Sequence, residues 1–152
     1  MSTSGEREGS KGQRPTARSV TKSVGIERAP AAVFAYLIDP ENWPQWAVVN
    51  VLAVSPRPGE AWWDMTTPTG PAALRLRPDA AFGILDHDFL AAEASWTVPA
   101  RVVPNGDGAE FIMTFFQPPQ FTNDFFDSQN ALVDIELARL KAILETGAGD
   151  RP

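Results

Sequence analysis

The chain has 152 residues, 43% of them hydrophobic, which is the length and composition of one soluble domain with a single core. It contains no cysteine, which excludes disulfides, thiolate zinc sites, iron–sulfur clusters and cysteine nucleophiles. A formal net charge of −6 with scattered basic residues argues against nucleic-acid binding, because phosphate contacts need clustered Lys and Arg. The single histidine, His87, excludes a two-histidine iron site and an HExxH zinc site, so we expect no metal and no cofactor.

Both ends of the chain are rich in small and polar residues. Residues 1–18 cannot bury enough apolar surface to order themselves, so they are predicted to be a disordered polar tail. Residues 147–152 are predicted to be a flexible C-terminal tail on the same grounds. No apolar run reaches the ~18 residues that span a bilayer, and the N-terminus lacks the apolar stretch of a signal peptide. We therefore expect no membrane span and a cytoplasmic location.

The first ordered segment predicts a strand followed by two short helices. Apolar and polar residues alternate from Val20 to Ile26 with the period of a half-buried strand. Pro30 marks a helix start, because proline is tolerated in the first helical turn. Pro40 ends that helix, since the residue before a proline avoids the helical region. A second helical turn is predicted over residues 41–46.

Residues 48–115 predict six further strands that follow one another as hairpins. In each strand the more apolar residues lie on one face, and the six faces share a register if every hairpin has a four-residue loop. Four of the five loops contain Gly or Pro. The apolar faces are predicted within 48–54, 61–65, 72–76, 83–89, 96–102 and 111–115, and the loops are 56–59, 67–70, 78–81, 91–94 and 105–108.

Residues 121–146 predict a long C-terminal helix. Its apolar stripe must be covered by the sheet, because each large buried apolar side chain contributes ~1.5 to 3 kcal/mol. Gly147 is a plausible C-terminal cap. The stripe consists of Phe126, Val133, Leu137, Leu140 and Leu144.

Residues 26–46, IERAPAAVFAYLIDPENWPQW, resemble the opening of the SRPBCC superfamily, which includes the birch-pollen-allergen and START-related domains, and within it the polyketide cyclase/dehydrase-like group. The segments FGILDH at 82–87 and ARVVPNGDGAEFIMTFFQ at 100–117 resemble the same group in order and spacing. The resemblance covers about residues 19–146 and implies an α+β helix-grip domain. In that fold a seven-stranded curved antiparallel sheet wraps around a long C-terminal helix, with two short helices after strand 1. The superfamily holds lipid carriers, cyclases, hormone receptors and chaperone activators, so it implies several functions.

A sheet curled around one helix predicts an apolar pocket between them. His87 is the predicted catalytic residue, because an imidazole can move a proton near neutral pH. Two alternatives stay open. The aromatic side chains are also typical of an ordinary core that has no pocket, and His87 could be a core histidine that makes one hydrogen bond. The register predicts these ligand-binding residues: Asn50, Trp63, Met65, Phe89, Trp96, Met113 and Phe115.

Charged residues near the predicted pocket are expected on the opposite face of the sheet. Asp86 and Asp88 flank His87 and are predicted to be solvated, unless a bulge re-aims one of them. Arg101 is predicted to point outward near Ile112 and to form a surface ion pair, either with Glu110 or with a neighbouring Asp.

The sequence thus predicts a domain that binds a small hydrophobic, aromatic or polyketide-like molecule. If the protein is an enzyme, the resemblance implies cyclisation or dehydration, in which the pocket folds a flexible substrate and His87 transfers a proton. The alternative is a non-enzymatic interaction module, or a lipid- or quinone-binding protein of the same fold. Ligand identity, turnover and assembly into a homo-oligomer are left open.

Overall fold

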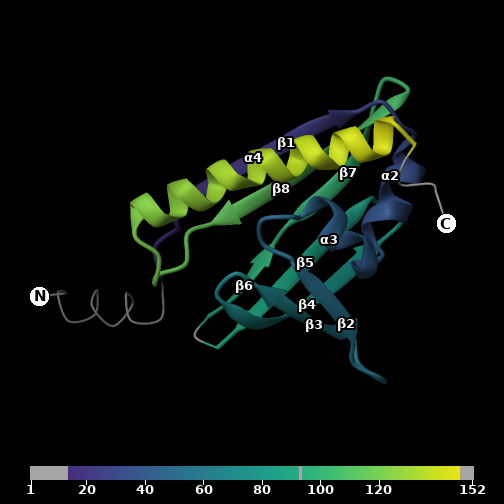
Figure 1. Ribbon diagram of the computed structural model, residues 1–152. Coiled ribbons are helices and arrows are strands. Elements are labelled where there is room, and N and C mark those ends of the chain that lie inside the picture. Colours follow the sequence, from purple (N-terminus) through teal and green to yellow (C-terminus); the bar gives the residue numbers. More distant parts are fainter. Residues whose placement is uncertain (1–13, 93, 148–152) are drawn as a thin grey trace, which may run out of the picture.

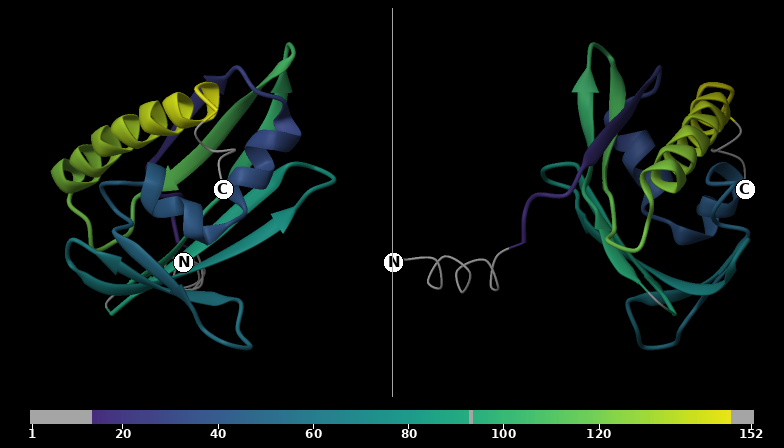
Figure 2. Two further views of the ribbon diagram at one scale, coloured as in Figure 1. Left: turned by 45° about the vertical axis from the view of Figure 1, so that its right-hand side comes forward. Right: turned by 90° about the vertical axis from the view of Figure 1, so that its left-hand side faces the viewer.

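The computed structural model describes residues 14–92 and 94–147. Most of the predicted N-terminal tail, residues 1–13, and most of the predicted C-terminal tail, residues 148–152, lie outside the described residues. The described chain forms one curved antiparallel sheet with a long helix, α4 (Asn123–Glu145), on its inner side (Figures 1 and 2). The predicted α+β helix-grip fold is confirmed.

The sheet is a meander closed by its first strand. The order is β1-β8-β7-β5-β4-β3-β2, and β6 lies off this path and pairs with β5. β1 (Ser19–Ile26) pairs antiparallel with β8 (Gly108–Phe116) along its whole length. The other strands are β2 (Ala53–Pro56), β3 (Trp62–Thr67), β4 (Gly70–Asp79), β5 (Ile84–Ala91), β6 (Ser95–Val98) and β7 (Ala100–Asn105).

Short helices follow β1, as predicted. They are α2 (Pro30–Leu37), the 3-10 turn η1 (Pro40–Asn42) and α3 (Trp43–Trp46). The Asp39 carboxylate caps η1 by accepting from the Glu41 N–H at 3.0 Å. The Trp43 indole N–H donates to the Leu37 carbonyl at 2.9 Å, and this bond fixes α3 against the end of α2.

Helix α4 begins with a side-chain cap and ends at a glycine. The Thr122 hydroxyl accepts from the Phe125 N–H at 3.1 Å, and Gly147 has φ +76° just beyond the helix. Lys141 Nζ donates to the Gly25 carbonyl of β1 at 2.7 Å. All five residues of the predicted apolar stripe are buried, and together they contribute about 7 to 15 kcal/mol before conformational entropy is subtracted.

Three of the five predicted loops have the predicted register, and the other two hairpins turn at later residues than predicted. Thr66 pairs with Pro71, Leu90 with Ser95 and Pro104 with Ala109, as predicted. The predicted loops 56–59 and 78–81 are wrong, because Pro56 pairs with Trp63 and Asp79 with Ile84. Each error moves the pairing by four residues, an even number, so every side chain keeps its predicted face.

Two predicted strands differ from the observed ones. The strand predicted to begin at Val48 begins at Ala53, because the Asn50 and Val51 N–H groups both donate to the Ala47 carbonyl in a turn after α3. Asn50 therefore lies on a turn, and its predicted strand position is wrong. The strand predicted over 96–102 is interrupted at Pro99, which separates β6 from β7 because proline has no N–H for the ladder.

Candidate functional site

Aromatic rings form a continuous series along the concave face. Ring centroids are 4.9 Å apart for Trp43 and His87, 5.4 Å for His87 and Phe89, and 5.5 Å for Phe89 and Trp96. The ring centroid of Phe121, which precedes α4, lies 6.4 Å from that of Trp96. We call these five residues the aromatic series. Trp43 and His87 are buried and the other three are half-buried, so the series runs from the interior to the surface.

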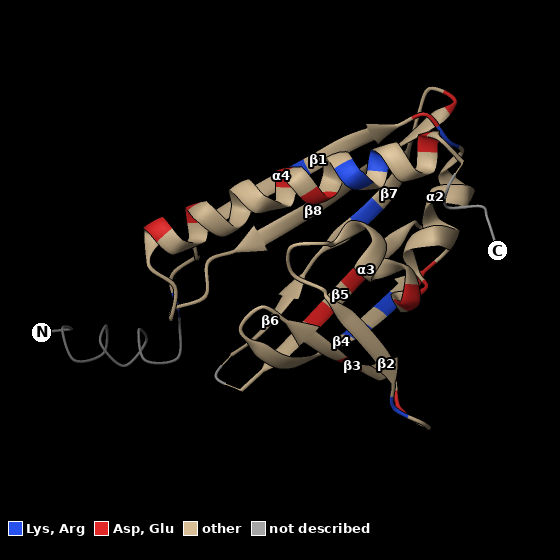
Figure 3. Ribbon diagram, in the orientation of Figure 1, with Lys and Arg blue, Asp and Glu red and all other residues tan. Residues whose placement is uncertain are grey.

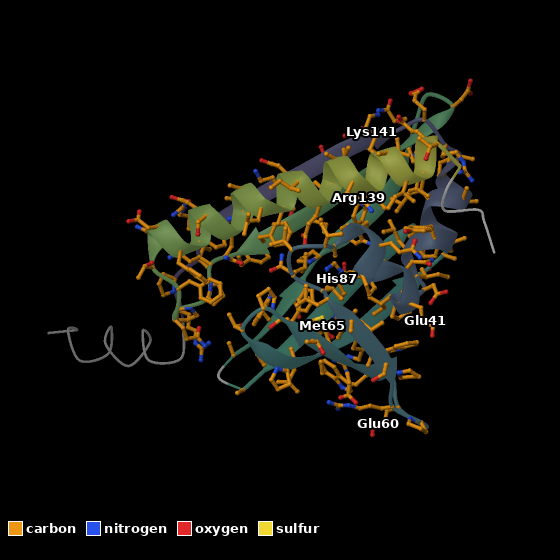
Figure 4. The ribbon with its side chains drawn as sticks, viewed as in Figure 1. Glu41, Glu60, Met65, His87, Arg139 and Lys141 are labelled. Atoms are coloured by element: carbon orange, nitrogen blue, oxygen red, sulfur yellow. The ribbon has the colours of Figure 1, made fainter. Side chains whose placement is uncertain are left out.

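His87 lies on β5, opposite Val98 as predicted, and is 1% exposed. Its Nδ1 is 2.9 Å from the Leu85 carbonyl, so Nδ1 carries the proton and donates it. Burial lowers the pKa of His87 to about 4, which keeps the ring neutral at physiological pH. In that tautomer Nε2 is an acceptor, and it has no hydrogen-bond partner in the described part of the chain. Figure 4 shows His87 in the interior, with Met65 near it in that view.

The other predicted ligand-binding residues of the sheet lie at different depths. Met65 and Met113 are buried in the core. Phe115 is half-buried and packs against this core, opposite Val20 of β1. Trp63 is half-buried opposite Leu74 of β4. Their alternating positions put them on the same face as His87, as the register predicted.

A buried carboxylate that the sequence analysis missed lies beside Asn50. Glu136 of α4 is buried, and its carboxylate accepts from the N–H groups of Val49 and Asn50 at 3.1 and 3.0 Å. The Asn50 side-chain amide donates to the same oxygen at 3.3 Å. Burial raises the pKa of Glu136. A signal was present, because Glu136 stands three residues after Val133 and four before Leu140 on the buried stripe.

A second buried polar group lies next to the aromatic series. The Trp46 ring is buried, with its centroid 5.0 Å from that of Trp43. Within the described ranges, its Nε1 is a fully buried side-chain atom without a hydrogen-bond partner. Buried donors are normally paired, so this N–H is a candidate contact for an oxygen of a bound molecule.

The prediction that Asp88 is solvated is wrong. Its side chain lies on the outer face of the sheet, as expected, but the residue is only 7% exposed. Its carboxylate accepts from Arg77 at 2.9 and 3.0 Å, from Arg75 at 2.8 and 2.9 Å, and from the Thr97 hydroxyl at 2.6 Å. These donors hold the pKa of Asp88 well below its usual range. Arg75 also stacks on the Trp62 ring, 4.6 Å from its centroid. Figure 3 shows the acidic residues of β5 beside the basic residues of β4.

The remaining predicted polar residues lie on the outer face as expected, with different partners. Asp86 accepts from the Ala100 N–H at 3.0 Å, which bridges β5 to the start of β7. Arg101 lies opposite Ile112, but its guanidinium donates to the Phe82 carbonyl at 2.6 Å. The predicted ion pair between Arg101 and Glu110 is wrong, because Glu110 accepts from the Asn105 amide instead.

A surface groove of about 800 Å³ meets the outer end of the aromatic series. It lies between β6 and the end of β8, and Trp96 belongs to both the groove and the series. The series therefore connects the buried imidazole to an open surface. The groove is lined by Arg14, Leu90, Ala91, Ala92, Ala94, Ser95, Trp96, Thr97, Pro99, Phe116, Gln117, Pro118, Pro119 and Gln120.

Residues 14–92 and 94–147 hold neither a membrane-spanning helix nor a metal-binding cluster. None of the helices there is both long and apolar enough to cross a membrane. Nor do those ranges contain a group of three His, Asp or Glu side chains that could hold a metal ion.

Comparison with known proteins shows likeness in structure. No family model and no curated protein matches the sequence. The Aha1 dimer subunit from Colwellia psychrerythraea matches with a TM-score of 0.69 at 14% identity, over 86% of this chain and 98% of that one. Ara h 8.0201 matches with a TM-score of 0.62 at 8% identity, over 83% of this chain and 96% of that one.

Two di-domain ARO/CYC proteins from biosynthetic pathways share the fold as well. The di-domain ARO/CYC StfQ from the steffimycin pathway matches with a TM-score of 0.67 at 15% identity, over 93% of this chain and 55% of that one. The di-domain ARO/CYC BexL from the BE-7585A pathway gives a TM-score of 0.67 at 14% identity, over 89% and 48%. This chain thus spans about half of each di-domain protein. The resemblance seen in the sequence is confirmed at the level of fold: the protein shares its helix-grip fold with Ara h 8.0201, the Aha1 dimer subunit and the two di-domain ARO/CYC proteins.

Proposed function

We propose that the protein binds a small hydrophobic molecule, aromatic or polyketide-like, on the concave face of its sheet. The observation that carries the proposal is the aromatic series, which joins buried His87 to the surface groove at Trp96. Aromatic rings offer large apolar surfaces and favour edge or stacked contacts with other rings. The fold shared with the ARO/CYC proteins and Ara h 8.0201 supports a ligand of this class.

Two polar atoms beside the series suit a ligand that carries oxygen. The Nε2 of His87 accepts a hydrogen bond and the Nε1–H of Trp46 donates one, and the Trp43 ring contacts both residues. A phenol or enol hydroxyl can donate to the first atom, and a carbonyl oxygen can accept from the second. Such contacts would orient an otherwise apolar molecule.

The same atoms define the chemistry available for a cyclisation. The neutral His87 Nε2 would take a proton from the carbon between two carbonyls of a poly-ketone chain. The carbanion attacks a second carbonyl carbon of the same chain, and the imidazolium returns its proton to the oxygen of that carbonyl. A pKa of about 4 makes the imidazole of His87 a weak base and its imidazolium a strong acid. Of the two proton transfers, the return of the proton to the carbonyl oxygen is therefore the more favourable.

A titration with the fluorescent probe 1-anilinonaphthalene-8-sulfonate tests the proposed binding. Phe89→Ala and Phe121→Ala each remove one ring of the series, and we expect about tenfold weaker probe binding. Phe82→Ala is the matched control, because Phe82 is 64% exposed and outside the series. Equal probe binding by all three variants and the parent would contradict the proposal.

A non-enzymatic interaction module is the second candidate, and a different observation favours it. Leu90 and Phe116, two large apolar residues that line the groove, are exposed. Exposed apolar side chains gathered in a groove are typical of protein contact surfaces. The likeness to the Aha1 dimer subunit is consistent with this candidate.

A further inference from the structure

The sheet splits between β6 and β8, and Pro99 is the cause. The β7–β8 ladder runs as far as the pair Ala100–Met113, and the Thr114 N–H then donates to the Pro99 carbonyl at 3.0 Å. An antiparallel pair normally exchanges two bonds, but Pro99 has no N–H to return to Thr114. Beyond this point no ladder pair joins β6 to β8 in the described chain.

Backbone groups of both strands face this split. The Ala91 N–H donates to the Ala94 carbonyl, so alternation along β6 directs the N–H and C=O of Thr97 away from β5 and toward β8. The bond from Thr114 to Pro99 likewise directs the N–H and C=O of Phe116 toward β6. Thr97 and Phe116 would be the next pair of the ladder. Their backbone groups have no hydrogen-bond partners among the described residues.

The split is the site of the 800 Å³ groove, and its surroundings are largely apolar. Leu90 and Phe116 are 44% and 47% exposed beside it. Trp96 and Pro118 also line it. The groove therefore combines unpaired strand edges on two walls with apolar side chains around them, which is the chemistry that an extended peptide satisfies.

We propose that this groove binds an extended peptide segment of a partner protein, inserted between β6 and β8 as an additional strand. A peptide strand supplies N–H and C=O groups to Thr97 on one side and to Phe116 on the other. Its side chains alternate between two faces. One set then lies toward Trp96 on the inner face, and the other toward Leu90 and Phe116 on the outer face. A small apolar molecule would leave the backbone groups unpaired.

The test uses a fluorescein-labelled heptapeptide of alternating Val and Thr with a lysine at each end. Binding is followed by fluorescence anisotropy, and amide hydrogen exchange is followed by NMR on the full ¹⁵N-labelled chain. We expect the amides of Thr97 and Phe116 to exchange freely in the protein alone and to slow at least about tenfold with peptide. Two versions of the peptide, N-methylated at odd or at even residues, should both bind weakly, because the inserted strand pairs on both edges.

Two surface variants complete the test. Phe116→Glu places a charge in the groove and should weaken peptide binding about tenfold. Ile135→Glu is the control, because Ile135 is 55% exposed on α4 and does not line the groove. The proposal is overturned if neither amide slows, if N-methylated peptide binds as well as the parent peptide, or if both amides are already protected in the free chain.

Discussion

The indole of Trp43 stands edge-on to the imidazole of His87, with ring centroids 4.9 Å apart and an interplanar angle of 78°. Trp43 comes from α3, so this contact places a helix over the inner face of β5. The bond from Nδ1 to the Leu85 carbonyl fixes the ring from its other side. Burial lowers the pKa of His87 and keeps the ring neutral, and the Leu85 bond fixes the tautomer, so that Nε2 is left to meet a ligand.

The neutral state of His87 predicts a pH-dependent stability. The folded pKa of about 4 lies below the usual value of 6.5, so below pH 6.5 the unfolded chain binds a proton that the folded chain does not. Stability is therefore lost as pH falls from 6.5 toward 4, by up to roughly 3 kcal/mol, and is unaffected above 6.5. Urea unfolding of the parent and His87→Gln from pH 7.5 to 4.5 measures this, and we expect the parent to lose more. If the difference in unfolding free energy between the two proteins stays constant over this pH range, the proposed coupling to His87 is excluded.

Glu136 is predicted to hold the turn between α3 and β2 against α4. Glu136→Ala leaves the N–H groups of Val49 and Asn50 without an acceptor and should cost about 1 to 3 kcal/mol of unfolding free energy. Glu136→Gln retains an acceptor oxygen and removes a buried charge, so it should cost less. Both are measured by urea unfolding at pH 7. An equal loss in the two variants would show that the acceptor is not what stabilises the turn.

Asp88 is predicted to stabilise the outer face of the sheet. Asp88→Asn weakens the bonds from Arg75 and Arg77, and because these arginines are partly exposed the cost should be about 2 kcal/mol at pH 7. Since the folded pKa is lowered, this stabilisation is present above about pH 4 and lost as pH falls further. Asp64→Asn breaks an exposed pair with Arg57 and should change the unfolding free energy far less than Asp88→Asn does. Similar losses from both variants would contradict the prediction.

Among the glycines that the structure describes, Gly83 is predicted to be the least tolerant of a side chain. It has φ +66°, and an added Cβ would lie 2.1 Å from the Val102 carbonyl oxygen. That backbone is fixed, because the Val102 N–H donates to the Gly83 carbonyl at 2.8 Å. Gly83→Ala should cost more than about 3 kcal/mol, whereas Gly59→Ala, with a positive φ and open space, should cost only about 1 to 2 kcal/mol. Urea midpoints compare them, and equal midpoints would refute the steric account.

Sequence periodicity predicted which face of each strand is apolar more reliably than it predicted pairing. His87 was placed inward correctly although the β4–β5 hairpin was misjudged, because an even shift of register keeps the face. The turn at Asn50 was missed, because its stabilising carboxylate lies 86 residues away on α4 and alternation carries no such information. Asp88 was expected in solvent for a similar reason, since its arginine partners are on the neighbouring strand. The break at Pro99 had a local signal in the proline itself.

The central claim is that the aromatic series binds a small aromatic molecule. The most direct measurement is an NMR experiment that detects nuclear Overhauser effects between bound 2-naphthol and the ¹³C-labelled protein. We predict contacts from the naphthol ring to Phe89 and Trp96 and from its hydroxyl end to His87. Absence of binding, or contacts confined to residues such as Leu90 and Phe116 at the surface groove, would contradict the claim.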